Sequence, residues 1–340
     1  MILFYALIFI LLSTFIFIKL SQKYKILLNY NGDIHQKYTS FEKTPLIGGC
    51  IFLLSIILFT DLTYLAKLYL ISIFIIGILS DLKLLKSPSK RLIFQFLIII
   101  IFLYILDLKL IFTKFQILDF FLQNIFFSFS FTAFCLLIVI NGTNFIDGNN
   151  LVVLGYYLMV TLIILFFNKH ELNTISELNI FLLIEVISIL LVFNFLNKIY
   201  LGDNGALLIG SFFGIILIEF YLENILKISS FFIVLILWYP AFENLFSIIR
   251  KFYFSKSPME PDDNHLHQLL YFFLLKKFKF NKIFINNSVG LLITLYNSII
   301  VFLGASYANH TQLMISLIFF NMTVYFTTYM FLKNFKKINT

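Results

Sequence analysis

Long apolar stretches recur along almost the whole chain, and short polar segments separate them. A helix that crosses the hydrocarbon core of a bilayer needs about 17 to 25 predominantly apolar residues. Eleven stretches approach this length, with the third and ninth short: 2–18, 46–60, 68–79, 92–106, 125–140, 151–167, 180–196, 206–221, 228–239, 288–307 and 313–332. The pattern predicts an all-α polytopic membrane protein. Because no Pro/Ser-rich linker interrupts it, we expect a single domain over residues 1–340.

The composition also predicts a chain that is solvated by lipid. Hydrophobic residues make up 61% of the chain and charged residues 12%, with a mean hydropathy of +0.97, whereas soluble domains are about one quarter charged. The first stretch has no cationic residue before it and no small-residue cleavage site. We therefore expect a retained helix rather than a signal peptide. Cys50 and Cys135 lie in predicted spans without metal-ligand spacing, and we expect them to be packing residues.

The basic residues predict the orientation of the chain, because Lys and Arg accumulate in cytoplasmic loops. With the amino terminus outside, all but five of the 25 Lys and Arg residues fall inside; the five outside are Lys67, Lys109, Lys114, Lys169 and Lys227. The carboxyl terminus is then cytoplasmic. The net charge of +8 fits this bias and an attraction to anionic lipid. Without a compact basic domain, it does not indicate nucleic-acid binding.

Three carboxylates, Asp81, Asp147 and Asp203, stand where apolar stretches meet inside loops. Mg²⁺ prefers oxygen ligands and is usually bound by one or two carboxylates together with substrate phosphates. The alternative is that these are solvated residues at helix ends, where Asp is a frequent cap. Because three such residues recur in loops on one face of the membrane, we favour the functional interpretation.

Asn141, Asn144 and Asp147 recur at every third position, which aligns them on one face if this segment is helical. Their amide and carboxylate groups suit a nucleoside or a sugar. A polar turn rich in Asn and Gly is equally consistent with the spacing. The amides of residues 202–205 precede a span and could point toward a phosphate, which by itself is a weak signal.

His265 and His267 lie in the longest inside loop. Imidazole is the wrong ligand class for Mg²⁺, so we expect this pair to donate hydrogen bonds to a diphosphate beside nearby Lys and Arg. Glu185 is the one acid predicted at membrane depth, and we expect a buried, hydrogen-bonded side chain there. Gly210 and Gly214 have the GxxxG spacing that favours close helix packing.

Four motifs together resemble those of the polyprenyl-phosphate N-acetylhexosamine-1-phosphate transferases, glycosyltransferase family 4. They are KTPLIGG, NGTNFIDG, LGDNG and PDDNHLHQLL, in the family's order. The resemblance implies Mg²⁺ as the cofactor, with Mn²⁺ as an alternative, a UDP-N-acetylhexosamine donor and a polyprenyl phosphate acceptor. It also implies a multi-pass protein of the bacterial cytoplasmic (inner) membrane whose site faces the cytoplasm. The oligomeric state is open, with a homodimer among the alternatives.

The resemblance further implies roles for individual residues. Asp203 would be the principal Mg²⁺ ligand, and Asp81 would assist the metal or orient the acceptor. The expected catalytic residues are Asp81, Asp203, His265 and His267; the expected substrate-binding residues are Asn141, Asn144, Asp147, Lys43 and Thr44; and the expected metal ligands are Asp203 and Asp147. Pro45, Gly48 and Gly49 are expected around the same pocket.

The chain departs from the family pattern at several positions. Ser80 stands where the family usually has the first residue of an Asp pair, and the further departures are Asn150, Leu151, Ala206 and Gln268. The missing Asp puts deprotonation of the lipid phosphate by that carboxylate in doubt. A phosphate monoester has a second pKa of about 6 and is mostly dianionic at pH 7. We therefore expect that the reaction can proceed without a general base.

The expected reaction transfers GlcNAc 1-phosphate from the UDP-sugar to the lipid phosphate and releases UMP, as a first membrane step of cell-envelope polysaccharide synthesis. GlcNAc is favoured over MurNAc-pentapeptide because the His loop resembles the GlcNAc-transferring branch. The alternatives are a catalytically silent relative and a membrane transporter. Transporters usually show repeats and interrupted spans near the midplane, whereas the polar residues here gather at one surface.

Overall fold

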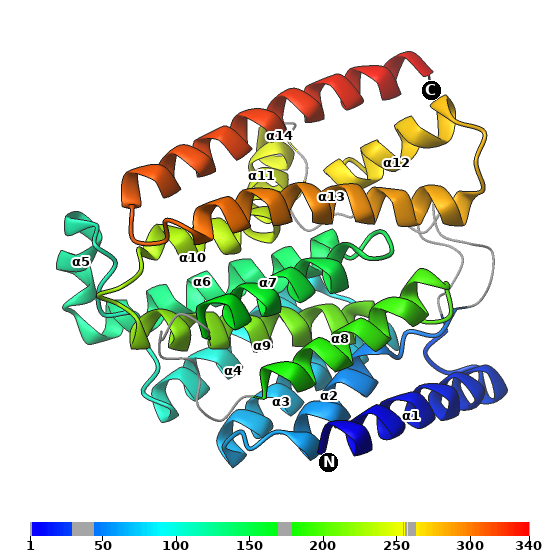
Figure 1. The fold of residues 1–340 in the computed structure, drawn as a ribbon, viewed down its shortest axis with the longest axis horizontal. Helices are drawn as coiled ribbons and strands as arrows, with labels where there is room; N and C mark the ends of the chain where they lie inside the picture. Colours follow the sequence, from blue (N-terminus) through cyan, green and yellow to red (C-terminus); the bar gives the residue numbers. More distant parts are fainter. Residues whose placement is uncertain are drawn as a thin grey trace.

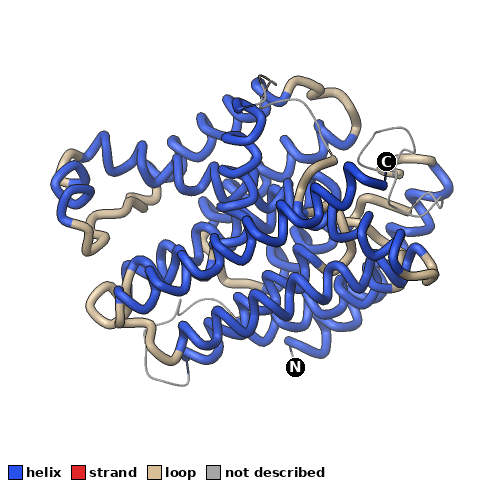
Figure 2. Tube along the Cα trace, turned by 90° about the horizontal axis from the view of Figure 1, so that it is seen from above, coloured by secondary structure: helices blue, strands red, loops and turns tan. Residues whose placement is uncertain are grey.

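The computed structural model describes residues 2–28, 44–168, 179–253, 255, 257 and 263–339. The regular secondary structure of these residues is helical, apart from isolated β-bridges of Leu28 with Pro45 and of Leu46 with Tyr200. Most helices run along a common direction, and loops gather at the ends of the bundle (Figure 2). The helices are α1 (Ile2–Tyr24), α2 (Gly48–Phe59), α3 (Tyr64–Asp81), α4 (Pro88–Ile105), α5 (Gln116–Leu122), α6 (Ile125–Ile146), α7 (Val152–Asn168), α8 (Ile180–Phe195), α9 (Gly202–Glu223), α10 (Ser230–Ile236), α11 (Trp238–Tyr253), α12 (Leu266–Lys277), α13 (Lys282–Ala305) and α14 (Thr311–Asn339).

Seven of the described helices are long and apolar enough to cross a membrane: α1, α3, α4, α6, α9, α13 and α14. Helices α10 and α11 meet the same criterion as a pair, and α2, α7 and α8 are shorter apolar helices. Together they occupy the stretches expected from the hydrophobic pattern. The all-α polytopic membrane fold is therefore confirmed, while the orientation of the termini stays a prediction.

Much of the surface of the bundle is apolar. Phe126 is 80% exposed and Tyr104 is 73% exposed, although side chains of this kind are mostly buried in soluble proteins. Lipid tails are as apolar as these side chains and solvate them without cost. The exposed aromatic and aliphatic residues therefore mark the surface that faces the bilayer.

Helix α9 lies at the centre of the bundle and packs most extensively against α3 and α6 (Figure 1). Small residues allow the close approach of α6. A Cβ atom on Gly210 would lie 2.7 Å from the Thr143 hydroxyl, and one on Gly214 would lie 2.7 Å from the Leu136 side chain. The prediction that this GxxxG pair serves helix packing is confirmed. This packing holds the helix that carries Asp203.

The ninth apolar stretch is not one straight helix, which corrects the continuous span expected over 228–239. Helix α10 ends at Ile236, α11 begins at Trp238, and the two axes differ by 76°. Pro240 lies in the first turn of α11. In a continuous helix its ring would clash with the carbonyl group of Ile236, four residues earlier. The chain therefore bends between the two helices.

Helix α11 turns its polar side toward the protein. Glu243, Asn244 and Ser247 are buried, whereas Leu245 and Ile249 are exposed. This is the reverse of an amphipathic helix on a soluble protein. The reversal is explained if α11 lies between lipid and a polar protein interior, because its apolar side chains then contact lipid and its polar side chains contact polar groups of the protein.

The two ends of the bundle carry different elements. Helix α12 and the last turns of α14 lie at one end, and α5 lies at the other (Figure 1). Helix α14 packs along α10 and α12. The end that carries α12 is also the end at which α3 and α6 finish and α9 begins, as the contacts between their terminal residues show.

Candidate active site

Asp81, the last residue of α3, forms hydrogen bonds with the first turn of α9. Its Oδ1 accepts from the backbone N–H of Asp203 at 2.9 Å, and its Oδ2 accepts from the backbone N–H and the side-chain amide of Asn204 at 2.9 and 2.6 Å. The first N–H groups of a helix have no partner within that helix, so this carboxylate caps α9. Gly202 has a φ of +71°, and a Cβ atom there would lie 2.9 Å from Asp81 Oδ2. Asp81 thus positions the backbone of Asp203.

The Asp203 carboxylate connects four helices. Its Oδ1 accepts a hydrogen bond from the side-chain amide of Asn144, on α6, at 2.9 Å. Its Oδ2 accepts from the hydroxyl group of Ser80, on α3, and pairs with the guanidinium group of Arg91, on α4. The same guanidinium nitrogen lies 2.5 Å from Ser80 Oγ. The Asp203 side chain is 29% exposed, so a ligand from outside can reach it.

Asp147 follows the last turn of α6, beside this cluster. Burial, together with the nearby charges of Asp203 and Asp81, raises the pKa of Asp147 well above the usual range. A cation between Asp147 and Asp203 would relieve this repulsion. The described residues hold no group of three or more His, Cys, Asp or Glu side chains placed for a metal, but one or two carboxylates with substrate phosphates suffice for Mg²⁺. Asp203 and Asp147 therefore fit such an ion.

The strip of Asn141, Asn144 and Asp147 lies in and just after the last turns of α6, as the spacing predicts for a helical segment. The structure divides the strip. Asn144 faces Asp203, whereas Asn141 lies about one turn earlier and donates a hydrogen bond to Gln95 Oε1, on α4, at 2.9 Å. The side-chain nitrogen of Asn141 also donates to the carbonyl group of Leu137 at 2.9 Å, so both of its hydrogen bonds are with protein.

The described part of the KTPLIGG motif lies against the start of α9. A Cβ atom on Gly49 would lie 2.2 Å from the side-chain oxygen of Asn204. Thr44 is buried, and its hydroxyl group donates to the carbonyl group of Asn197 at 3.3 Å. The contacts described for Thr44 are thus with protein and support the loop before α9. Lys43 lies outside the described residues.

His265 and His267 lie at the start of α12, beside the end of α6. Their rings stack with centroids 5.7 Å apart, and the His265 ring lies 5.4 Å from that of Phe145. A Cβ atom on Gly148 would lie 2.1 Å from His267 Nε2. Burial lowers the pKa of His267 to about 3, so the ring is neutral at pH 7, and neither ring nitrogen has a hydrogen-bond partner among the described residues. The structure thus brings the His pair next to Asp147.

The middle of the chain matches a known family. Residues 63–221 match the family model described as glycosyl transferase family 4. The resemblance to this family, expected from the motifs, is confirmed. The matched segment contains Asp81, Asn141, Asn144, Asp147 and Asp203, and the His pair follows it.

Curated relatives of the chain carry related names. The phospho-N-acetylmuramoyl-pentapeptide-transferase of Dictyoglomus thermophilum is 29% identical over 190 residues, which are 51% of this chain and 58% of the relative. The undecaprenyl-phosphate alpha-N-acetylglucosaminyl 1-phosphate transferase of Thermotoga maritima is 31% identical over 72 residues, 21% of this chain and 23% of the relative. The decaprenyl-phosphate N-acetylglucosaminephosphotransferase of Mycolicibacterium smegmatis is 30% identical over 152 residues, 39% of this chain and 37% of the relative. The chain thus spans 58% or less of the length of these relatives.

Glu243 of α11 belongs to this site, lies outside the family 4 segment and was not identified from the sequence. It is 1% exposed. Its Oε1 lies 2.9 Å from His265 Nδ1, and its Oε2 accepts a hydrogen bond from the Tyr325 hydroxyl group of α14 at 2.8 Å. Glu243 therefore orients the His265 ring. The sequence does contain a signal, since Glu243 is a single acid within the apolar segment WYPAFENLF. The predicted ninth span ended at residue 239, before this acid, so Glu243 was not noticed.

Glu185, the acid expected to be buried and hydrogen bonded, is only half-buried in α8. Its Oε2 has no hydrogen-bond partner among the described residues. The expectation was therefore wrong. The rotation of α8 that buries Leu182, Val186 and Leu190 leaves Glu185 at the edge of the packed face.

A group of asparagines holds the loop that follows Asp147 in the family 4 segment. The Asn149 amide donates to Asn286 Oδ1 at 2.7 Å, and the Asn150 amide donates to Asn287 Oδ1 at 2.9 Å. Both acceptors belong to α13. Buried amides stabilise a structure when their partners are present, so Asn150, a departure from the family pattern, fixes this loop against α13.

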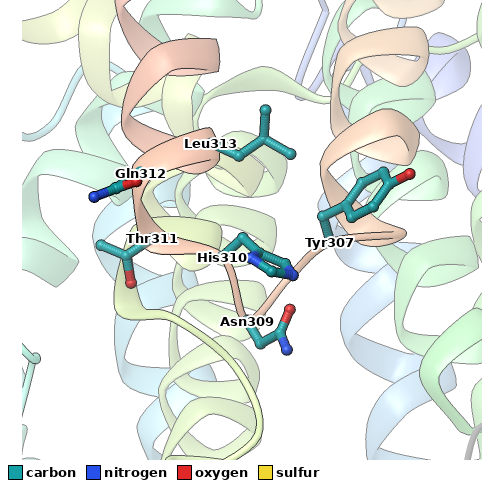
Figure 3. Close-up of a pocket in the computed structure, with 6 residues that line it drawn as sticks. All are labelled: Tyr307, Asn309, His310, Thr311, Gln312 and Leu313. Atoms are coloured by element: carbon teal, nitrogen blue, oxygen red, sulfur yellow. The ribbon is translucent and has the colours of Figure 1, made fainter.

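Two cavities of the described part lie away from the carboxylates. One of about 520 Å³ opens at the turn between α13 and α14, at the opposite end of α13 from α12 (Figure 3). It is lined by Tyr307, Asn309, His310, Thr311, Gln312 and Leu313. Another of about 190 Å³ lies between α7, α8 and α13 and has mainly apolar walls. Neither offers carboxylates for a divalent cation, so the cluster around Asp203 is the better candidate for a family 4 active site.

Proposed function

We propose that the chain transfers N-acetylhexosamine 1-phosphate from a UDP-sugar to a polyprenyl phosphate and releases UMP. The observation that carries the proposal is the cluster of Asp203, Asn144 and Arg91, next to Asp147 and a His pair, at one end of an apolar bundle. Two of the relatives are named for N-acetylglucosamine phosphate transfer with undecaprenyl or decaprenyl phosphate. These names support GlcNAc as the sugar.

In the proposed reaction an oxygen atom of the lipid phosphate attacks the β-phosphorus of the UDP-sugar. The bond between that phosphorus and the bridging oxygen breaks, and UMP leaves with the bridging oxygen. Such transfers depend mainly on positioning and on neutralisation of charge. The acceptor phosphate is mostly dianionic at pH 7. No carboxylate base is then required, and Ser80 is compatible with turnover.

Acidic residues would bind the divalent cation and position its ligands. Asp203 and Asp147 would hold Mg²⁺ or Mn²⁺, which when bound would neutralise charge on the diphosphate. Asn144 holds the Asp203 carboxylate through its 2.9 Å hydrogen bond. Asp81 acts on Asp203 through the backbone of α9.

The His pair would bind the phosphates of the donor. His267 is neutral and fully buried, and its ring nitrogens have no partner among the described residues, so its one N–H group would reach a phosphate after a local rearrangement of the site. Glu243 orients His265 for the same purpose. These contacts need no metal ligation by imidazole.

The lipid acceptor must reach the cluster from the bilayer. Helix α11 connects the two environments, because Glu243 lies on its buried side and Leu245 and Ile249 lie on its exposed apolar side. A polyprenyl tail can remain in lipid while its phosphate meets the polar side. The distribution of Lys and Arg favours the cytoplasmic face of a bacterial membrane for this reaction.

Release of UMP by the purified chain tests the proposal. In nanodiscs with undecaprenyl phosphate, UDP-GlcNAc and Mg²⁺, we expect Asp203→Asn to lower the rate by about a hundredfold or more, because it removes the negative charge that would hold the cation at the diphosphate. Asp107→Asn is the control, since the Asp107 side chain is 78% exposed and pairs with Lys109. Full activity of Asp203→Asn would overturn the metal assignment. Absence of UMP release with every UDP-N-acetylhexosamine would favour a silent relative or a transporter.

A further inference from the structure

The position of Arg91 is not explained by its own helix. It is the fourth residue of α4, after the cap at Ser87 and Pro88 at the first helical position. The amino-terminal end of a helix carries partial positive charge and disfavours cations. The Arg91 guanidinium group nevertheless lies near this end of α4, where it contacts Asp203 Oδ2 and Ser80 Oγ. Asp203 therefore determines where this side chain lies.

The donors around Asp203 fill the acceptor positions of Oδ2 rather than those of Oδ1. Asn144 donates to Oδ1, whereas Ser80 and Arg91 both contact Oδ2. A divalent cation can therefore bind at Oδ2 only if one of these two donors gives way. The neutral amide and hydroxyl groups can remain nearby, but two cations on one oxygen atom repel each other. Arg91 is thus the group that must leave.

The ion pair is open enough to exchange. The Arg91 side chain is 26% exposed and that of Asp203 is 29% exposed. Ion pairs with this access to water are weak and are readily replaced. The displaced guanidinium stays tethered to the first turn of α4, within the reach of one side chain from the cluster.

We propose that Arg91 occupies the metal position on Asp203 in the unloaded protein and that an arriving divalent cation displaces its guanidinium onto a substrate phosphate. This inference rests on the function proposed above. The planar guanidinium fork matches phosphate oxygens and can bind two of them at once. Metal loading and phosphate binding then favour each other, because the metal frees the guanidinium for the phosphate and the phosphate holds the guanidinium away from Asp203.

A role as a structural pin between α4 and α9 makes the opposite prediction for the metal. Removal of a pin would loosen the cluster and weaken metal binding. Removal of a resident cation would strengthen it, because the metal no longer has to displace a charge. The sign of the change in metal affinity therefore separates the two roles.

Binding of Mn²⁺ to the full chain in nanodiscs without substrate, followed by electron paramagnetic resonance, measures this sign. We expect Arg91→Gln to bind Mn²⁺ about threefold to tenfold more tightly than the unmodified chain, and Arg91→Lys to fall between the two. Lys90→Gln is the matched control, since it removes the same charge from the neighbouring, exposed position, and we expect less than a twofold change. Unchanged or weaker Mn²⁺ binding by Arg91→Gln, or by Arg91→Lys should the first variant not fold, would refute the proposal.

Steady-state kinetics test the phosphate contact. We expect Arg91→Gln to raise the KM for one phosphate-bearing substrate by about tenfold, and a rise for UDP-GlcNAc or for undecaprenyl phosphate identifies which phosphate receives the guanidinium. Unchanged values for both would refute this part. Two further results show which proposal has failed. If Asp203→Asn leaves Mn²⁺ binding intact, the metal assignment is wrong. If the unmodified chain releases no UMP, the proposed function is wrong, while the comparison of metal affinities stands.

Discussion

Replacement of Asp81 distinguishes a helix cap from a metal ligand or a base. Asp81→Ala removes three hydrogen bonds to the start of α9, two from backbone N–H groups and one from the Asn204 amide. Loss of an N-cap costs about 0.5 to 2 kcal/mol. Donors left unpaired in a buried position cost roughly 1 to 3 kcal/mol. The Asn204 amide keeps its hydrogen bond to the carbonyl group of Leu46 at 2.9 Å and is not left unpaired. We therefore expect Asp81→Ala to lower the free energy of unfolding by about 2 kcal/mol.

Asp81→Asn separates the capping role of Asp81 from a role of its negative charge. Asp81→Asn keeps one acceptor oxygen, and Asn is as good a cap as Asp, so we expect its stability to stay within about 1 kcal/mol of the unmodified chain. Activity should follow the position of Asp203. We expect Asp81→Ala to lose about a hundredfold in turnover, because small misplacements of a catalytic group have effects of this size, and Asp81→Asn to lose about tenfold or less.

Thermal unfolding in detergent and UMP release on the same samples provide the two measurements. A loss of about 2 kcal/mol corresponds to a fall of several degrees in Tm, which we expect for Asp81→Ala. A stable but inactive Asp81→Asn would show that the negative charge itself is needed, as for a metal ligand or a base. An Asp81→Ala variant with unchanged Tm would refute the capping argument.

Three further changes test other contacts of the site. Glu243→Gln should lower kcat/KM about tenfold, because Glu243 orients His265. Tyr325→Phe removes only the hydrogen bond from the Tyr325 hydroxyl group to Glu243 and should lower kcat/KM less than threefold. Equal effects of the two variants in a UMP assay would contradict this order. Burial lowers the pKa of His267 from 6.5 to about 3, so between these pH values the unfolded chain binds more protons than the folded chain. The free energy of unfolding should therefore fall as pH decreases below about 6.5, by up to about 1.4 kcal/mol per pH unit. His267→Gln should flatten the dependence of Tm on pH, and parallel curves for the two proteins would disprove this. Gly49→Ala should lower Tm and turnover together, because its Cβ atom would lie 2.2 Å from Asn204 Oδ1, and an unchanged Tm would show that the loop before α9 can adjust.

Much of the fold follows from the sequence, because each apolar stretch reports a local free energy of transfer into lipid. The described helices occupy those stretches, and Gly210 and Gly214 pack against α6 as their spacing predicts. The grouping of Asn144, Asp147 and Asp203 was also expected, since their motifs border loops on one face. The 2.9 Å hydrogen bond from Asn144 to Asp203 places two of these motifs in contact.

Other features depend on how the helices are rotated and bent against each other. The capping of α9 by Asp81, the ion pair of Arg91 with Asp203 and the orientation of His265 by Glu243 join residues from different helices. Spacing along one helix contains no information about which face of a neighbour it meets. The sequence by itself thus determined the membrane helices and the motifs of this protein. Only the tertiary structure decided which donor meets which carboxylate, because those pairings are set by packing between helices that are far apart in the chain.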